Sequence, residues 1–283
     1  MRIYDLHTHS TASDGLLSPT ELVLRARAKG VETLALTDHD TTAGLHEAQT
    51  AANEHGLELV PGVEISATWR ERTIHIVGLG IDPTNSVLLD GLTTLQHKRD
   101  ERAQRIAERL EKEGFTNVLA GARSFGDGRN VTRTHFARYL VKQGVAAQVS
   151  DVFKHYLRRG KPGYVNAYWA PLADAVAWIN AAGGKAVIAH PSRYDLTGTK
   201  MRELLTDFAA SRGAAIEVIY CSGCDPNTQR SNARFAKEFG LAASVGSDFH
   251  DPSVPWVELG KLGRLPPDIT PVWNMLSTVT ARN

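Results

Sequence analysis

Short apolar runs of strand-like composition alternate with helical patterns along most of this chain, and this alternation constrains the fold more than any other feature. The runs lie at residues 3–6, 31–37, 57–64, 73–80, 185–189, 214–219 and 241–245. Strands separated by helices typically pair in parallel, as βα units. We therefore predict an α/β fold with a closed or nearly closed seven-stranded βα barrel. An open doubly wound sheet is the alternative.

The first predicted helix has the clearest boundaries. Ser18 is a good N-cap, Pro19 suits the first helical position, and Glu21 completes a capping box. Gly30 can adopt the left-handed conformation that ends a helix. Further helices are predicted at about residues 44–55 and at 171–182.

Residues 97–164 interrupt the alternation, because no β-branched run of comparable strength occurs there. The segment reads as three helices and a loop, at residues 97–113, 134–143, 149–157 and 124–128. We predict a helical insertion that contributes to the substrate site, in a barrel made of residues 1–96 and 165–283. The insertion carries the most basic local stretch of the chain: Arg133, Arg138, Lys154, Arg158, Arg159 and Lys161.

Residues of metal-binding types recur at the ends of the predicted strands. They are His7, His9, Asp14, His39, Glu64, His75, His190, Asp248 and His250. In a barrel of parallel strands those ends converge on one rim. So many imidazoles and carboxylates in one place would be unfavourable without cations between them. The chain therefore reads as a multinuclear metal enzyme.

The histidine pair at the first strand illustrates the chemistry. His7 and His9 are two residues apart, so on an extended segment both point to the same face. Imidazole suits zinc, manganese or iron, and carboxylates hold harder ions. Asp38 and Asp40 flank His39, where either could orient an imidazole. An exposed loop carboxylate is the alternative for Asp40. Glu217 ends the sixth run, either beside the site or simply within the barrel.

Composition excludes several classes of function. The chain has 283 residues, 42% hydrophobic and 22% charged, with a net charge of +1, so overall charge favours neither nucleic acid nor a membrane surface. The start of the chain does not resemble a signal peptide, and no apolar run is long enough to span a membrane. Cys221 and Cys224 form a lone C-x-x-C, which predicts neither a zinc nor a redox site. We expect a reduced, cytoplasmic location.

The ordered motifs resemble the PHP (polymerase and histidinol phosphatase) family. The resemblance spans almost the whole chain and rests on His7-Thr8-His9, Thr37-Asp38-His39, Pro61-Gly62-Val63-Glu64, Ala189-His190-Pro191 and Ser247-Asp248-Phe249-His250. Two motifs of the insertion are similar to one subgroup, the 3′,5′-nucleotide bisphosphate phosphatases and 5′–3′ exoribonucleases. They are Arg133-Thr134-His135-Phe136-Ala137-Arg138 and Tyr156-Leu157-Arg158-Arg159-Gly160.

The resemblance implies a distorted, TIM-like seven-stranded barrel with two or three divalent metal ions. Manganese is the first choice, and zinc, iron or magnesium are alternatives. By resemblance, one ion would be held by His7, His9, Glu64 and Asp248, a second by Glu64, His75 and His190, and a third by Asp14, His39 and His250. His75 is the least secure ligand, because its run also reads as an ordinary strand.

The resemblance further implies a phosphoesterase that removes the 3′-phosphate of a nucleoside 3′,5′-bisphosphate. Metal ions can activate water for attack on phosphorus, and His39, Asp248 and His250 are the expected catalytic residues. The candidate substrate-binding residues are Arg133, His135, Arg158, Ser192 and Arg193. Arginine suits the second phosphate because its planar fork donates two parallel hydrogen bonds.

Other functions remain open at this stage. A 5′–3′ exonuclease acting on short RNA or DNA would use the same site, and histidinol-phosphate phosphatase is a further enzymatic alternative. A non-catalytic structural module would be expected to lose ligand residues, whereas all nine positions are filled. We expect a small phosphorylated nucleotide as the partner, short oligonucleotides as further ligands, and neither a membrane nor an obligate protein partner.

Overall fold

The computed structural model describes residues 2–126, 130–221, 224–254 and 256–276. The proposed loop at 124–128 is therefore described only as far as Gly126, and Asp127 and Gly128 lie outside these residues. No helix among the described residues is both long and apolar enough to cross a membrane.

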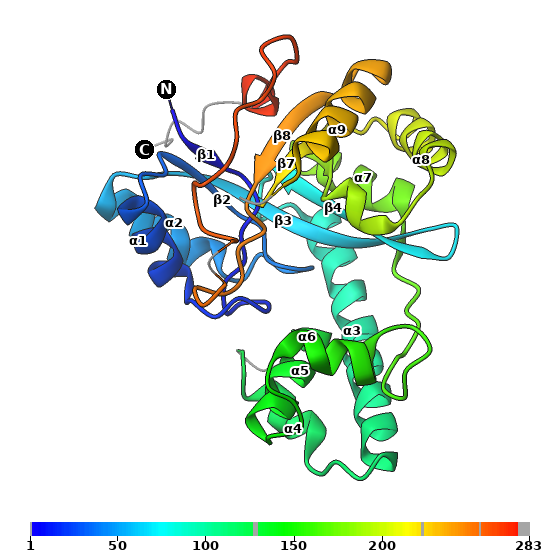
Figure 1. The fold of residues 1–283 in the computed structure, drawn as a ribbon. Coiled ribbons are helices and arrows are strands. Elements are labelled where there is room, and N and C mark those ends of the chain that lie inside the picture. The colour runs from blue at the N-terminus through cyan, green and yellow to red at the C-terminus, as the bar shows by residue number, and fades with distance from the viewer. Residues whose placement is uncertain (1, 127–129, 222–223, 255, 277–283) are drawn as a thin grey trace.

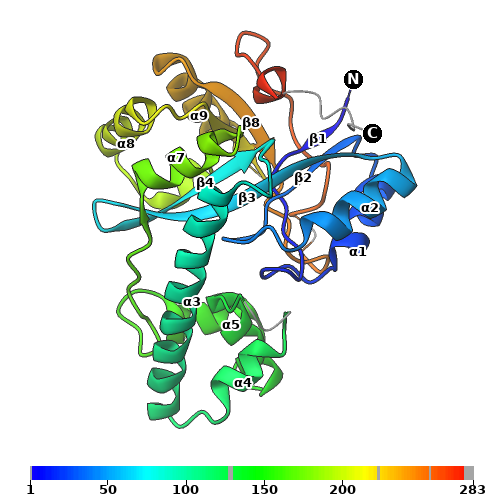
Figure 2. The same cartoon turned by 180° about the vertical axis from the view of Figure 1, so that it is seen from behind.

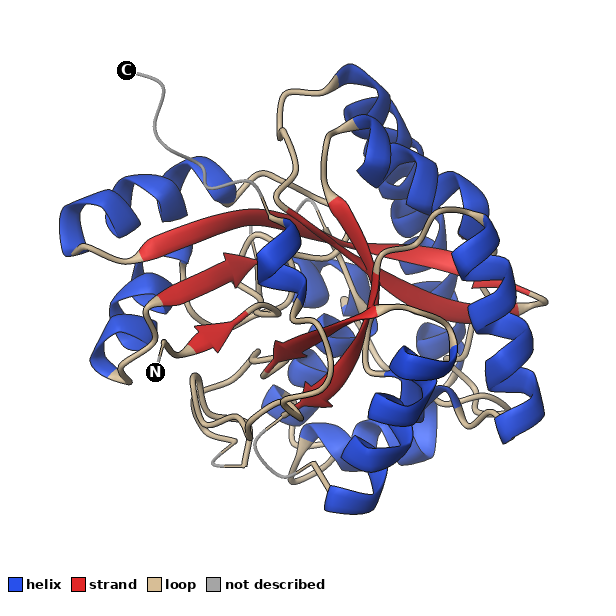
Figure 3. Ribbon diagram, turned by 90° about the horizontal axis from the view of Figure 1, so that it is seen from above, coloured by secondary structure: helices blue, strands red, loops and turns tan. Residues whose placement is uncertain are grey.

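One sheet forms the centre of the molecule, with helices packed around it (Figure 3). Its strands follow the order β1-β2-β3-β4-β6-β7-β8. Their bounds are Tyr4–Asp5, Thr33–Leu36, Glu58–Trp69, Arg72–Leu79, Lys185–Ile188, Ala215–Tyr220 and Ala242–Gly246. A further short strand, β5 (Ala170–Pro171), pairs with β3.

The two ends of the sheet, β1 and β8, approach each other. The Leu6 N–H donates to the Val245 carbonyl at 3.0 Å, and Thr8 forms a parallel bridge with Phe249. The sheet is thus a nearly closed barrel of seven strands, as the sequence predicted, and the open doubly wound sheet is wrong.

The predicted parallel pairing fails at β4, which is antiparallel to both β3 and β6. Arg70 and Glu71 join β3 to β4 with φ angles of 45° and 66°. Positive φ at both central residues is the conformation of a tight hairpin turn. Two residues cannot hold the crossover that a parallel connection requires, so the chain must reverse direction here.

Helices cover the outside of the barrel (Figures 1 and 2). They are α1 (Pro19–Ala28), α2 (Leu45–His55), α7 (Leu172–Ala181), α8 (Gly198–Ala210) and α9 (Pro226–Glu238). Two 3₁₀ turns, η2 (Pro191–Tyr194) and η3 (Val272–Met275), follow β6 and β8 in the chain. The capping box predicted at Ser18 and Glu21 is present at the start of α1.

The insertion is a helical unit below the barrel in Figure 1. It contains α4 (Val118–Arg123), α5 (Arg133–Lys142), α6 (Val149–Val152) and the π-helical turn η1 (Phe153–Leu157), and α3 (Ser86–Lys112) joins it to the barrel. The predicted start of α3 at residue 97 is wrong, because the helix begins at Ser86. Leu88, Leu92 and Leu95 pack in the barrel core, and Ala103, Ile106 and Leu110 pack in the core of the insertion. One continuous helix therefore serves both cores.

Candidate metal centre

The nine predicted metal-binding residues come from most strands of the barrel. Residues after β1, β2, β6 and β8 supply seven of them, in the loops expected from the sequence. Glu64 and His75 instead lie inside β3 and β4. The prediction that Glu64 ends its strand is wrong, since β3 continues as one arm of the hairpin as far as Trp69.

Glu64 is at the centre of this cluster, and its carboxylate is completely buried. Imidazole nitrogens surround its two oxygens: His39 Nδ1 at 2.8 Å, His75 Nδ1 at 2.9 Å, His190 Nε2 at 3.1 Å, and Nε2 of both His7 and His9 at 3.3 Å. The hairpin thus places Glu64 where residues from several other strands meet.

The cluster contains overlapping groups whose ligand atoms lie within 4.8 Å of one another. These groups are His7, His9, Glu64 and Asp248; His9, Asp14, His39 and His250; and His39, Glu64 and His75. The first equals one set implied by the family resemblance, and the second adds His9 to another. The third has His39 in the place of His190, although His190 also contacts Glu64.

Several buried polar atoms of this cluster lack hydrogen-bond partners, and a bound divalent cation would satisfy them. Asp14 Oδ1, His39 Nδ1, Glu64 Oε2 and His190 Nδ1 have no hydrogen-bond partner in the structure. His39 Nδ1 and Glu64 Oε2 are close but not in hydrogen-bonding geometry. Leaving such groups unsatisfied costs free energy. A mixed set of imidazole and carboxylate donors suits manganese, zinc or iron.

The carboxylates stabilise the charged forms of His7 and His9, whereas burial lowers the pKa of His39 and of His190. Burial lowers the pKa of His7, but Glu64, Glu217 and Asp248 raise it well above its usual value. Burial likewise opposes charge on His9, whereas Asp248 and Glu64 raise its pKa to about 9. Burial would raise the pKa of Glu64, yet the surrounding imidazoles hold it well below its usual range. The centre therefore demands positive charge, which bound cations would also supply.

Two carboxylates left open by the sequence support this centre. Glu217 lies 2.7 Å from His7 Nδ1 and accepts the His190 N–H at 2.5 Å. Asp40 is fully buried, which excludes the exposed alternative, and accepts from the Ser66 N–H at 2.6 Å. Glu217 thus holds the ring of His7 and the backbone of His190. Asp40 contacts no imidazole among the described residues, and it holds the backbone of β3 two residues beyond Glu64.

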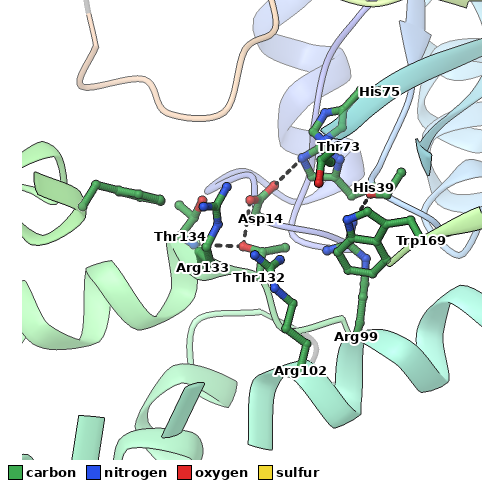
Figure 4. Close-up of a pocket in the computed structure, with 12 residues that line it drawn as sticks. Asp14, His39, Thr73, His75, Arg99, Arg102, Thr132, Arg133, Thr134 and Trp169 are labelled. Atoms are coloured by element: carbon green, nitrogen blue, oxygen red, sulfur yellow. Dashed lines mark hydrogen bonds and ion pairs between the residues drawn. The ribbon is translucent and has the colours of Figure 1, made fainter. Parts of the chain in front are cut away.

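A cavity of about 110 Å³ opens between the cluster and the insertion (Figure 4). Its lining on one side includes Asp14, His39 and His75. On the other side it includes Arg99, Arg102, Arg133, Thr132 and Thr134, with Phe153 and Trp169. Three of the candidate metal ligands and three arginines therefore line the same cavity.

Comparison with known proteins now identifies the family. The model of the PHP domain matches residues 5–165 of the chain. The chain belongs to the PHP domain family. It is 51% identical to the 5′-3′ exoribonuclease of Haemophilus influenzae, over 95% of this chain and 97% of that protein.

A phosphatase and a solved structure from Chromobacterium violaceum are also similar to this chain. The 3′,5′-nucleoside bisphosphate phosphatase is 46% identical over 96% of this chain and 95% of the relative. The solved structure of an amidohydrolase with bound SO4 and no metal superposes with a TM-score of 0.92 at 45% identity, covering 96% of this chain and 95% of that one. The PHP fold is therefore shared along nearly the full chain.

Arg102 and Arg133 line the cavity of this PHP protein without a paired carboxylate among the described residues. Burial, with the nearby Arg133 and Arg99, lowers the pKa of Arg102 to about 9, and burial also lowers the pKa of Arg133. Arg99 pairs with Asp40, but no described carboxylate lies at ion-pair distance from Arg102 or Arg133. Partly buried cations without a paired carboxylate favour the binding of an anion.

The other predicted substrate-binding residues lie outside this cavity lining. Arg158 is exposed and follows η1, and His135 is buried with Nδ1 accepting the Thr132 N–H at 3.0 Å. Arg193 pairs with Asp248, and the Ser192 hydroxyl donates to Asn232 at 3.3 Å. Of the five, Arg133 alone is part of the described cavity lining.

Sequence reasoning missed Arg102. Its only signal is its place in a charged helix that leads into the insertion, and that pattern equally suits a solvated surface. Cys221 and Cys224 are free thiols and belong to none of the groups that could hold a metal.

Proposed function

We propose that this PHP protein hydrolyses the 3′-phosphate of nucleoside 3′,5′-bisphosphates, giving the nucleoside 5′-monophosphate and phosphate. One observation carries the proposal: a single cavity has three candidate metal ligands, Asp14, His39 and His75, on one side and Arg102 and Arg133, which have no ion-pair partner in the described part of the chain, on the other. Such a cavity suits a ligand with two anionic groups. The 5′-phosphate would bind the arginines and the 3′-phosphate would face the metal ligands.

Two or three divalent ions, with manganese our first choice, would activate water and stabilise the leaving oxygen. The nine residues of the centre would hold them. His39 lines the cavity, with 12% of its side chain accessible, so a phosphate in the cavity can reach it. His250 is also partly exposed, at 24%, and lies 3.2 Å from Asp14, which lines the same cavity. We retain His39, Asp248 and His250 as the residues that act at the reacting phosphate.

The second candidate is 5′–3′ exoribonuclease activity on short oligonucleotides. The name of the Haemophilus influenzae relative, at 51% identity, favours it. A 5′-phosphorylated oligonucleotide offers the same two groups, a 5′-phosphate and a phosphodiester on the 3′-oxygen of its first nucleotide. The net charge of +1 favours short rather than long strands.

Phosphate and nucleotide release from a substrate panel tests both candidates. The manganese-loaded protein is assayed with adenosine 3′,5′-bisphosphate, adenosine 5′-monophosphate, histidinol phosphate and a 5′-phosphorylated trinucleotide. We expect turnover of the bisphosphate, with the trinucleotide also degraded if the second candidate holds. Preference for histidinol phosphate, or no turnover of any of the four, would refute the proposal.

We also propose a reduced, cytoplasmic location without an obligate protein partner. The two free thiols are in keeping with a reducing compartment. Localisation of a tagged protein by cell fractionation, with its mass in solution, tests this.

A further inference from the structure

The insertion reaches the candidate metal centre through Thr132, the N-cap of α5. The Thr132 hydroxyl donates to Asp14 Oδ2 at 2.8 Å, and both residues are buried (Figure 4). The other oxygen, Asp14 Oδ1, lies 3.2 Å from His250 Nε2 and 3.8 Å from His39 Nε2. Thr132 therefore turns one oxygen of Asp14 toward the imidazoles.

The orientation of the Thr132 hydroxyl is fixed from within the insertion. Its oxygen accepts the Thr134 N–H at 3.1 Å, so its single proton is free to point at Asp14. The Thr132 N–H donates to His135 Nδ1 at 3.0 Å. The first turn of α5 thus holds Thr132 in place, and the next residue, Arg133, lines the cavity.

Neighbouring contacts join the insertion to the same part of the barrel. The Asn130 side chain donates to the backbone carbonyl of His39. Arg99 of α3 donates to Asp40 at 2.6 Å and to Ser66 at 2.9 Å. Segments around Asp14 and His39 are therefore bound by the insertion rather than by the barrel alone.

We propose that Thr132 is a positioning residue that couples phosphate binding at Arg133 to metal binding by His9, Asp14, His39 and His250. The inference rests on the proposed metal-dependent function. An anion on Arg133 adds a further restraint to the first turn of α5, whose geometry sets the hydroxyl that orients Asp14. Such coupling is reciprocal, so a cation held by Asp14 also strengthens phosphate binding.

The test is a manganese titration by calorimetry, with and without adenosine 5′-monophosphate. Adenosine, which lacks the phosphate, is the ligand control, and free manganese is corrected for binding to the nucleotide. In the wild type we expect the nucleotide to tighten the weakest manganese site by about 5-fold or more. Absence of any tightening overturns the proposal.

Thr132→Val removes the hydroxyl and nearly keeps the shape of the side chain. We expect the weakest site to bind manganese about 10-fold less tightly or worse, without tightening by the nucleotide. Thr132→Ser should restore both properties. If Thr132→Val keeps the affinity and the nucleotide effect of the wild type, the inference is wrong.

A matched variant separates this role from helix capping. Thr197 is the N-cap of α8, where its side chain accepts the Lys200 N–H at 3.3 Å. Thr197→Val removes a helix cap of the same kind at a helix that is not part of the metal centre. Its manganese affinities should therefore equal those of the wild type. An equal loss in both variants would show a general stability effect and overturn the proposal. Since the titration measures binding rather than turnover, its outcome does not depend on whether the protein has 3′-phosphatase activity.

Discussion

Glu217 Oε1 lies 2.7 Å from Nδ1 of His7, deep in the barrel. A carboxylate only accepts, so His7 Nδ1 carries the proton and Nε2 faces Glu64 and Asp248, at 3.3 and 3.4 Å. Such a partner fixes the tautomer and the ring orientation of a metal-binding histidine. Glu217 of β7 thus orients His7, although the two residues are far apart in the sequence.

Replacing Glu217 should weaken metal binding without removing a ligand. Glu217→Gln keeps the size of the side chain but loses the charge, and we expect manganese to bind about 10- to 100-fold less tightly. Calorimetric titration measures this. Glu203→Gln, on the surface of α8, is the control. Unchanged affinity in Glu217→Gln would show that His7 does not need this partner.

Removing Arg102 should reduce selectivity for bisphosphates. A hydrogen bond to a charged group contributes about 1.5–3 kcal/mol, so Arg102→Met should lower kcat/KM for adenosine 3′,5′-bisphosphate by about 10- to 150-fold. The value for adenosine 3′-monophosphate should change little, because it lacks the 5′-phosphate.

Arg133→Met should have the same effect as Arg102→Met. Arg158→Met tests whether Arg158, which the sequence predicted to bind substrate, contributes to binding. Arg158 is exposed and absent from the cavity lining, so kcat/KM should stay close to that of the wild type for both nucleotides. A loss of bisphosphate selectivity in Arg158→Met alone would place the 5′-phosphate elsewhere.

Gly246 has no space for a side chain. A Cβ there would lie 2.3 Å from Cβ of His7 and 3.1 Å from Glu217 Oε1. Gly246→Ala should destabilise the protein by about 1–3 kcal/mol and weaken manganese binding, because His7 must move. Denaturant unfolding and metal titration measure the two effects. Gly198→Ala, at an open position of α8, should leave manganese binding unchanged.

The buried pair of Arg99 and Asp40 joins α3 to the barrel. Arg99→Met leaves Asp40 charged and unpaired, so we expect a loss of about 3–5 kcal/mol in the free energy of unfolding. Arg99→Met combined with Asp40→Asn should lose less, because no buried charge remains. Denaturant unfolding of the metal-free proteins checks both values, and a double variant as unstable as the single one would contradict this role of the pair.

The sequence predicts the barrel and brings its candidate ligands together because strand ends converge whenever parallel strands close. It does not predict the hairpin of β3 and β4, because an apolar run does not indicate whether a strand is parallel or antiparallel to its neighbours. Glu64 nevertheless reaches the centre, from within a longer strand.

The cavity depends on long-range packing, which residue patterns do not record. Arg102 and Arg158 look alike in sequence, as cations of a charged helical region. The packing of α3 against the segment at Val165 and Trp169 partly buries Arg102, whereas Arg158 stays in solvent. Thr132 is similarly ordinary in sequence until the fold brings it to Asp14.

The most direct test of metal-dependent 3′-phosphatase activity is product analysis of adenosine 3′,5′-bisphosphate by chromatography, before and after removal of metal with EDTA. We predict adenosine 5′-monophosphate and phosphate as the products of the manganese-loaded protein. We predict no turnover after EDTA treatment and recovery when manganese is restored. Release of adenosine 3′-monophosphate, or full turnover by the metal-free protein, would contradict the proposed function.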